Sequence, residues 1–446
     1  MSLSKLYKII FVLSLTQILI STKALANDQV QTISLSQALN LLEKQNYSLK
    51  QAKSRSDEAL AIVRQATAPL LPKLIATGNY TRNSDKAEIT LGTLFSQLPL
   101  PASAQNNLPP NIVMQPQESF SATGSLHVPI FVPTAWADRR AANETAAAAS
   151  ATIDSTRLQL RTVLKNAALL SNAAETIVTA AEQAVIVAQE QVQLAMRAVQ
   201  AGTAAQLSIL QAQTYATRRE SDKVRALAEL ERSRLAIAII LGQSEPIKIE
   251  LEENSDTLQQ AKQQLIDYAL SHRPELLAQN SLTKAAQAQL SSAWWRLAPE
   301  LSATGSVFAS DIEYPSGKKN GWRTTIDLNW TLYDGGFRYG KKDQAQAQIV
   351  SARASADALR LSIIQEVEDT TRELQVAQEQ LRLALKQREL AAQAAATAKR
   401  GFAAGTTGSV DVLDANDKLF QAEMSLANAK AQAGIAKIAI DRAVGR

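Results

Sequence analysis

The chain has 446 residues, of which 46% are hydrophobic and 20% charged, and it contains no cysteine. The lack of cysteine excludes disulfides, thiolate catalysis, thiolate metal sites and a lipid anchor on an N-terminal cysteine. Three of the charges behind the formal net charge of +5 are lysines near the N-terminus. Because no basic cluster with interleaved aromatic residues follows, nucleic-acid binding is not indicated.

Residues 1–26 have the pattern of a cleaved secretory signal. A segment with two lysines precedes the apolar stretch Ile9–Ile20, which is too short to span a bilayer. The sequence Ala24–Ala26 fits the cleavage pattern, so the mature chain is expected to begin at Asn27. No later apolar run is long enough for a membrane-spanning helix.

The rest of the chain contains a tandem repeat. The block "LLPKLIATG" (Leu70–Gly78) returns as "LAPELSATG" (Leu297–Gly305), and "AGTAAQLSILQAQ" (Ala201–Gln213) returns as "AGTTGSVDVLDAN" (Ala404–Asn416). Blocks that recur in the same order indicate one structural unit duplicated within the chain. Each repeat, 27–245 and 246–446, is therefore expected to hold a helix, two strands, a very long helix, a turn and a return helix.

The strands are predicted from alternating apolar and polar residues. They cover about 72–83 and 119–131 in the first repeat, and about 299–311 and 322–333 in the second. This alternation suits an outer-membrane barrel, although a soluble antiparallel sheet with one wet face shows it too. The secretory signal favours the membrane. Since lipid does not tolerate open sheet edges, several chains would have to complete the barrel, and the residues alone do not fix their number.

Each pair of strands is followed by a very long predicted helix, at about 135–201 and about 337–403, and a return helix, at about 205–242 and about 409–444. The long segments are rich in strong helix formers, and each would be about 100 Å long. Their apolar residues show coiled-coil spacing, at Val163, Ala167, Leu170, Ala174, Ile177, Ala181, Ala184 and Ala188, and at Ile363, Val367, Thr370, Leu374, Ala377, Leu381 and Ala384. A second valine stripe on another face predicts neighbours on two sides, as in a cylindrical array of helices.

The segment "GTTGSVDVLDANDKLFQAE" (Gly405–Glu423), the repeated Leu-Pro and Thr-Gly blocks and "YDGG" (Tyr333–Gly336) resemble the TolC family of outer-membrane efflux and secretion ducts. The resemblance covers residues 27–446. It implies a mainly α fold with transmembrane β-strands, in which a homotrimer forms a 12-stranded outer-membrane barrel that continues as a periplasmic α-helical barrel. The implied location is the outer membrane of a Gram-negative bacterium, with the helices in the periplasm.

Asp411 and Asp414 lie on one face at the start of the last helix. From the residues alone, the favoured interpretation is an N-terminal cap. The resemblance instead implies a periplasmic gate, in which aspartates at these two positions form rings that constrict the channel.

Other gate positions depart from the family pattern. Thr407 stands where a basic, gate-locking residue would lie, Leu207 and Ser208 stand where its partners would lie, and Phe402 replaces a tyrosine. We therefore predict a gate held more by packing of the hairpin helices than by a salt bridge.

The glycine and threonine pairs after the two long helices mark the hairpin turns. A glycine after a helix is a common C-terminal cap, while the resemblance implies that the same turns contact a periplasmic adaptor (membrane fusion) protein. The four residues are Gly202, Thr203, Gly405 and Thr406. The other partners implied are an inner-membrane pump of the RND or ABC type and outer-membrane lipid.

No nucleophile–base pair, phosphate loop or metal motif is found in the sequence, and His127 and His272 have no ligand cluster around them. We therefore predict neither an enzyme nor a cofactor or metal site. The expected function is a passive export duct for small-molecule efflux or type I secretion. The alternative is a coiled-coil stalk or surface protein without transport activity, which explains the helices but not the strands. The sequence indicates neither the substrate nor the energy source of the pump.

Overall fold

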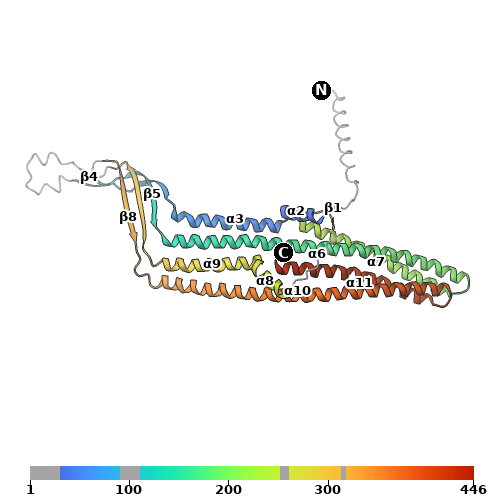
Figure 1. Ribbon diagram of the computed structural model, residues 1–446. Coiled ribbons are helices and arrows are strands. Elements are labelled where there is room, and N and C mark those ends of the chain that lie inside the picture. Colours follow the sequence, from blue (N-terminus) through green and yellow to red (C-terminus); the bar gives the residue numbers. More distant parts are fainter. Residues whose placement is uncertain (1–30, 91–110, 252–260, 313–317) are drawn as a thin grey trace, which may run out of the picture. The chain divides into compact units, whose positions relative to one another are not determined.

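The computed structural model describes residues 31–90, 111–251, 261–312 and 318–446 (Figure 1). The expected signal, 1–26, lies outside them. The helices are α2 (Leu35–Gln45), α3 (Tyr47–Thr67), the 3₁₀ turn η2 (Ala68–Leu70), α6 (Pro133–Gln200), α7 (Gln206–Leu241), α8 (Lys262–His272), α9 (Pro274–Trp295), α10 (Phe337–Ala403) and α11 (Ser409–Val444). The strands are β1 (Gln31–Ser34), β2 (Lys73–Arg82), β3 (Ala87–Thr90), β4 (Asn111–Gln115), β5 (Glu118–Phe131), β6 (Ile247–Glu250), β7 (Glu300–Ser310) and β8 (Asn320–Asn329).

The described residues divide into two compact units, and each unit takes segments from both sequence repeats. One comprises the described residues up to Gln51 and those of Asp154–Arg273 and Ser362–Arg446. The other comprises those of Ala52–Ile153 and Pro274–Leu361. The first unit contains both hairpin turns, and the second contains the main sheet.

The main sheet is antiparallel and has the strand order β2-β5-β7-β8. Its register brings apolar positions together on one face, because Leu74 lies opposite Leu126 and Tyr80 lies opposite Phe120. The same face continues across β7 and β8, where Leu301 lies opposite Leu328. The alternation in the sequence thus becomes one continuous apolar face.

This sheet is exposed on both faces within the chain. Every residue of β2 is exposed, and the apolar side chains of Leu74, Tyr80 and Ile326 are 79%, 62% and 69% exposed. Among the strands that the structure describes, β2 and β8 each pair along one edge only. A soluble sheet with one wet face would bury its other face, and this sheet does not.

The last strand is shorter than predicted. β8 ends at Asn329 instead of near position 333. The next residue, Trp330, donates its indole N–H to the carbonyl of Leu297 at 3.1 Å. Gly335 and Gly336 then adopt φ values of +70° and +92°, which glycine accepts without strain. The alternation of apolar and polar residues in the sequence therefore continues beyond the point where the backbone leaves the sheet.

The long helices α6 and α10 have 68 and 67 residues, and α7 and α11 return antiparallel to them (Figure 1). In α10 the predicted stripe is buried at Ile363, Val367, Thr370, Ala377 and Ala384. In α6 the stripe is only partly covered, because Val163 and Leu170 are 42% and 47% exposed. The single chain thus leaves part of this apolar stripe without a neighbour.

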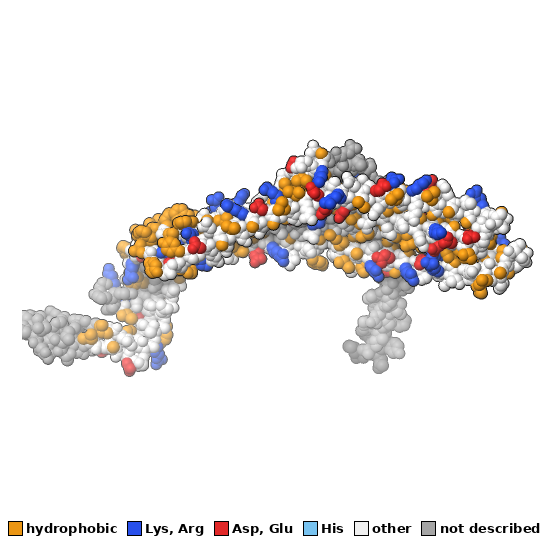
Figure 2. Space-filling view, turned by 90° about the horizontal axis from the view of Figure 1, so that it is seen from below, with side chains coloured by type: hydrophobic (Ala, Val, Ile, Leu, Met, Phe, Trp, Pro, Cys, Tyr) orange, Lys and Arg blue, Asp and Glu red, His pale blue; other side chains and the backbone are white. Residues whose placement is uncertain are grey.

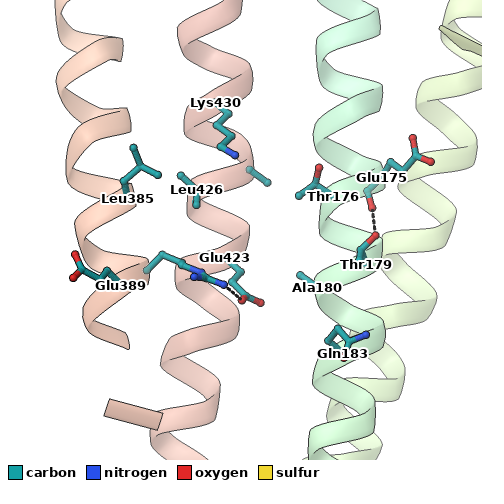
Figure 3. Close-up of a pocket in the computed structure, with 12 residues that line it drawn as sticks. Glu175, Thr176, Thr179, Ala180, Gln183, Leu385, Glu389, Glu423, Leu426 and Lys430 are labelled. Carbon is teal, nitrogen blue, oxygen red and sulfur yellow. Dashed lines mark hydrogen bonds and ion pairs between the residues drawn. The ribbon is translucent and has the colours of Figure 1, made fainter. Parts of the chain in front are cut away.

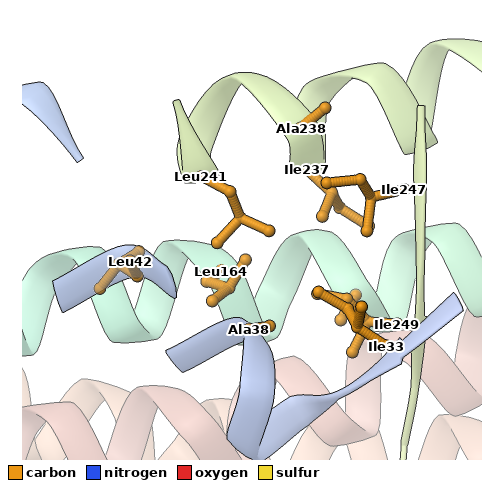
Figure 4. Packing of buried hydrophobic residues seen from close by; sticks show 10 residues of the cluster. Ile33, Ala38, Leu42, Leu164, Ile237, Ala238, Leu241, Ile247 and Ile249 are labelled. Carbon is orange, nitrogen blue, oxygen red and sulfur yellow. The ribbon is translucent and has the colours of Figure 1, made fainter. Parts of the chain in front are cut away.

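A small core that the sequence did not predict lies in the first unit. β1 pairs in parallel with β6, far away in the sequence. Leu42 and Leu164 pack beneath this pair and are fully buried. Figure 4 shows the cluster that they form with Ile33, Ala38, Ile237, Ala238, Leu241, Ile247 and Ile249. A second unpredicted pair, β3 with β4, lies within the long loop between β2 and β5.

Candidate functional site

The two hairpin turns have the same backbone structure. Gly202 and Gly405 both have a φ of +74°. The amide of Thr203 donates to the carbonyl of Ala198, five residues earlier, at 2.9 Å. In the second turn Thr406 donates to Gly401 at the same distance. This bonding is a Schellman cap, which satisfies the last carbonyls of a helix.

The threonine hydroxyls add a second bond to each cap. The Thr203 hydroxyl donates to the carbonyl of Ala198 at 3.0 Å, and the Thr406 hydroxyl donates to Gly401 at 3.1 Å. Both turns are exposed. Each Gly-Thr pair therefore closes its hairpin through the backbone and presents no charged side chain.

Asp411 caps its own helix. It is the third residue of α11, and its carboxylate accepts a hydrogen bond from the Gly408 amide at 3.2 Å. An acidic group in the first turn also complements the positive end of the helix dipole. The cap interpretation therefore holds within a single chain.

Asp414 is exposed one turn further along α11 and pairs with Lys418 at 2.7 Å. The hydrogen bond from Lys418 to this carboxylate raises the pKa of Lys418 above its ordinary value. Both side chains are more than half exposed. The Asp414 carboxylate therefore has a cationic neighbour of its own chain.

The remaining predicted gate residues lie on separate hairpins. Leu207, 60% exposed, and Ser208 begin the return helix of the first hairpin, whereas Phe402 and Thr407 flank the second turn. A Cβ added to Gly401 would collide with the hydroxyl of Thr407, so the missing side chain lets Thr407 pack against its own hairpin. Within the described residues, no hydrogen bond or ion pair joins these side chains across the two hairpins.

A buried arginine joins the return helices α7 and α11. Arg219 on α7 is 2% exposed and pairs with Asp222 at 2.9 Å and with Asp417 on α11 at 3.0 Å. Its guanidinium carbon also lies 5.1 Å from the ring centroid of Tyr215 and 4.7 Å from that of Phe420. We call these five residues the Arg219 clamp.

Tyr215 is a partly buried member of the clamp. Burial raises the pKa of the Tyr215 phenol above its ordinary value, and the positive charge of Arg219 partly opposes this effect. The clamp was not predicted from the sequence, because an Arg-Arg-Glu segment is typical of a solvated helix face. A signal was present, since Arg219 continues the buried stripe of Ala212 and Ala216.

A groove of about 630 Å³ lies between α6 on one side and α10 and α11 on the other. Figure 3 shows Glu175, Glu389, Glu423 and Lys430 among the side chains that line it. Arg388 pairs with Glu423 there at 3.5 Å. The groove therefore carries charges of both signs.

Neither a membrane-crossing helix nor a metal site is found in the described part of the chain. None of its helices is both long and apolar enough to cross a bilayer. No three His, Asp or Glu side chains of the described residues are placed to hold a metal ion.

The four-stranded sheet with two unpaired edges and the two long helical hairpins are also found together in known outer-membrane channels. The fold is similar to VceC of Vibrio cholerae, with a TM-score of 0.75 and 20% identity over 92% of this chain and 96% of that one. It is equally similar to the open state of MtrE from Neisseria gonorrhoeae, with a TM-score of 0.75 and 17% identity over 92% and 88% of the two chains.

The chain belongs to the outer membrane efflux protein family, whose model matches residues 38–243 and 265–446. Over 158 residues it is 31% identical to the outer membrane protein TolC of Salmonella enteritidis. That alignment covers 33% of this chain and 32% of the relative, so the chain spans about a third of the length of the curated relatives it matches. The family assignment places the protein in the outer membrane.

Proposed function

We propose that the protein is a passive export duct formed by three copies of the chain. The observation that carries this proposal is the sheet, with one continuous apolar face and two unpaired edges. Lipid excludes open edges, and an apolar outer face suits the hydrocarbon layer. Strands from three copies would close a 12-stranded barrel. Because α6 follows β5 directly, the barrel would open into a path between the long helices.

The periplasmic gate would lie at the second hairpin turns. Three copies would bring their Asp411 and Asp414 carboxylates around one narrow opening, which would favour cations. Lys418 would offset part of this charge, because it pairs with Asp414 in the same chain. We propose that packing of the hairpins holds the gate closed, while the Arg219 clamp keeps the two return helices of each chain together.

The proposed partners are a periplasmic adaptor protein and an inner-membrane pump of the RND or ABC type. Gly202, Thr203, Gly405 and Thr406 support the adaptor contact, because their exposed turns present backbone of one shape in both repeats. Glycine at both turns also allows another chain to approach closely.

The test is single-channel conductance of the purified protein in planar bilayers. Asp411→Asn/Asp414→Asn removes the two charges but keeps an oxygen that can accept the Gly408 hydrogen bond. We expect a small, cation-selective conductance for the wild type, and a loss of selectivity in the double variant. Lys418→Gln should increase cation selectivity. Asp369→Asn is the matched control, since Asp369 is another exposed acid with an ion-pair partner on its own helix.

The possible outcomes test the proposed duct and the proposed aspartate gate separately. A folded trimer without conductance would contradict the duct and favour the stalk without transport activity. Conductance whose selectivity is the same in the double variant and in the wild type would support the duct and reduce Asp411 and Asp414 to a helix cap and a surface ion pair.

A further inference from the structure

Exposed aromatic side chains gather where the strands meet the helices. The antiparallel order brings the start of β2 and β7 and the end of β5 and β8 to one end of the sheet. The aromatic residues there are Trp136, Trp294, Trp295, Trp330, Tyr333, Phe337 and Tyr339, between 47% and 81% exposed. We call these seven residues the junction belt. Four of the five tryptophans of the chain belong to it, and Figure 2 shows hydrophobic side chains gathered at this end of the helices.

A small polar pocket lies just beyond the junction belt, between the first turns of α6 and α10 and the last turns of α9. Its volume is about 260 Å³, and its lining includes Asp138, Ser292, Arg296, Lys341 and Gln344. Two of these side chains are cationic and one is anionic. The pocket therefore carries a net positive charge and offers hydroxyl and amide donors beside it.

The cations of this pocket differ from their neighbours in having no carboxylate partner. Arg338 is bound to Asp334 at 2.7 Å, and Lys342 lies 3.5 Å from Asp343. Arg296 and Lys341 form no ion pair with any residue that the structure describes. Lys341 donates to the amide oxygen of Gln344 at 3.2 Å, and its Nζ lies 5.7 Å from the ring centroid of Phe337.

The position of the pocket matches the depth of lipid headgroups. Tryptophan and tyrosine mark membrane interfaces in proteins. Lys341 is four residues after the start of α10 at Phe337, which is about 6 Å along the helix. The headgroup layer on each side of a bilayer is roughly 5–7 Å thick. If the junction belt lies at the edge of the hydrocarbon, the pocket lies among the headgroups.

We propose that Arg296 and Lys341 bind the phosphate of a phospholipid in the periplasmic leaflet of the outer membrane. This inference rests on the proposed function, because it needs the sheet to lie in the membrane. The two unpaired cations supply charge-assisted hydrogen bonds to the phosphate, and the junction belt packs against the acyl chains. Asp138 lies in the same pocket and favours a headgroup that carries an ammonium or hydroxyl group.

The test is native mass spectrometry of the detergent-purified full chain, titrated with dioleoyl phosphatidylglycerol. Dioleoylglycerol, which has the same acyl chains without the phosphate, is the lipid control. Arg296→Gln/Lys341→Gln should bind the phospholipid about 10- to 30-fold more weakly, since each basic residue near a membrane contributes about a factor of five. The protein control is Lys284→Gln/Arg353→Gln, two exposed bases on α9 and α10 that lie farther from the strands. It should stay within about twofold of the wild type.

Equal phospholipid binding by Arg296→Gln/Lys341→Gln and the wild type would overturn the proposal. So would equal losses in the test and control variants, or displacement of the lipid by an equimolar amount of inorganic phosphate. Conductance in planar bilayers is measured alongside. Normal conductance of Arg296→Gln/Lys341→Gln together with lost lipid binding would support both the lipid site and the duct. Absent conductance in the wild type would contradict the duct alone.

Discussion

The Arg219 clamp allows a sharp test of what holds the return helices together. In Asp417→Asn the guanidinium of Arg219, 2% exposed, keeps only Asp222 as an ionic partner. Removing one partner of a buried ion pair costs about 3–5 kcal/mol. We therefore expect Asp417→Asn to destabilise the contact between α7 and α11 by an amount in this range.

Arg219→Met should cost less. The carboxylates left behind, Asp417 and Asp222, are 20% and 22% exposed, so water can reach them. Two nitrogen atoms of Arg219 have no hydrogen-bond partner among the described residues, and methionine removes that penalty while it fills part of the space. Two cation–π contacts are lost as well, each worth about 0.5–2 kcal/mol. The expected cost is about 2 kcal/mol.

The assay is the rate of trypsin cleavage after Arg400, an exposed residue one turn before the second hairpin turn. When cleavage follows local opening, 2 kcal/mol corresponds to a rate increase of about 30-fold. We expect this increase for Arg219→Met and at least about 100-fold for Asp417→Asn. Arg232→Met is the control, because Arg232 pairs with Glu229 on the same helix α7 with both side chains well exposed, and such pairs contribute little.

Two results would refute the reasoning about the clamp. Equal cleavage rates for Arg219→Met and Arg232→Met would show that the buried ion pair does not hold the helices together. A larger effect for Arg219→Met than for Asp417→Asn would contradict the argument from exposure.

Three further predictions concern other parts of the first unit. Gly405 has a φ of +74°, so Gly405→Ala forces alanine into a left-handed conformation at a cost of about 1 kcal/mol. Trypsin should then cleave after Arg400 about fivefold faster. Gly340→Ala, a change inside α10, should leave this cleavage rate unchanged. Leu164→Ala empties a fully buried position and should reduce stability by about 2–5 kcal/mol, measured as a lower melting temperature. Burial raises the pKa of the Asp441 carboxyl above its ordinary value of 3.8. The folded state therefore binds the carboxyl proton more tightly than the unfolded state does, and the stability of the fold decreases as the pH rises above 3.8. Asp441→Asn should therefore raise the melting temperature at pH 7 and leave it unchanged at pH 3, and an equal gain at both pH values would contradict the assignment.

The long helices were predictable because their signal is local and repeated. Strong helix formers, interrupted only at Gly340 and Gly401, fill α10 from Phe337 to Ala403, and a glycine lies just beyond each end. The end of β8 was less predictable, because the hydrogen bond of Trp330 to Leu297 depends on the folded chain. Alternation alone does not show where pairing stops.

The candidate site likewise has features that the sequence predicts and features that it does not. The turns at Gly202 and Gly405 follow from glycine after a helix, a local rule. The Arg219 clamp joins residues almost 200 positions apart, and its sequence signal is a single charge on an apolar stripe. The pairing of β1 with β6 is equally remote in sequence. Contacts of this kind depend on the tertiary fold, and one sequence does not encode them as a pattern.

The two hairpin turns share their backbone but differ in chemistry. The positions of Asp411 and Asp414 in the second repeat correspond to Ser208 and Gln211 in the first. In a ring of three chains, six turns of one shape would therefore alternate between acidic and neutral. A partner protein that recognises backbone shape would find six equivalent binding sites, whereas a partner that recognises charge would find three. The number of partner molecules in the assembled complex would thus show whether the partner recognises the shape of the turns or their charge.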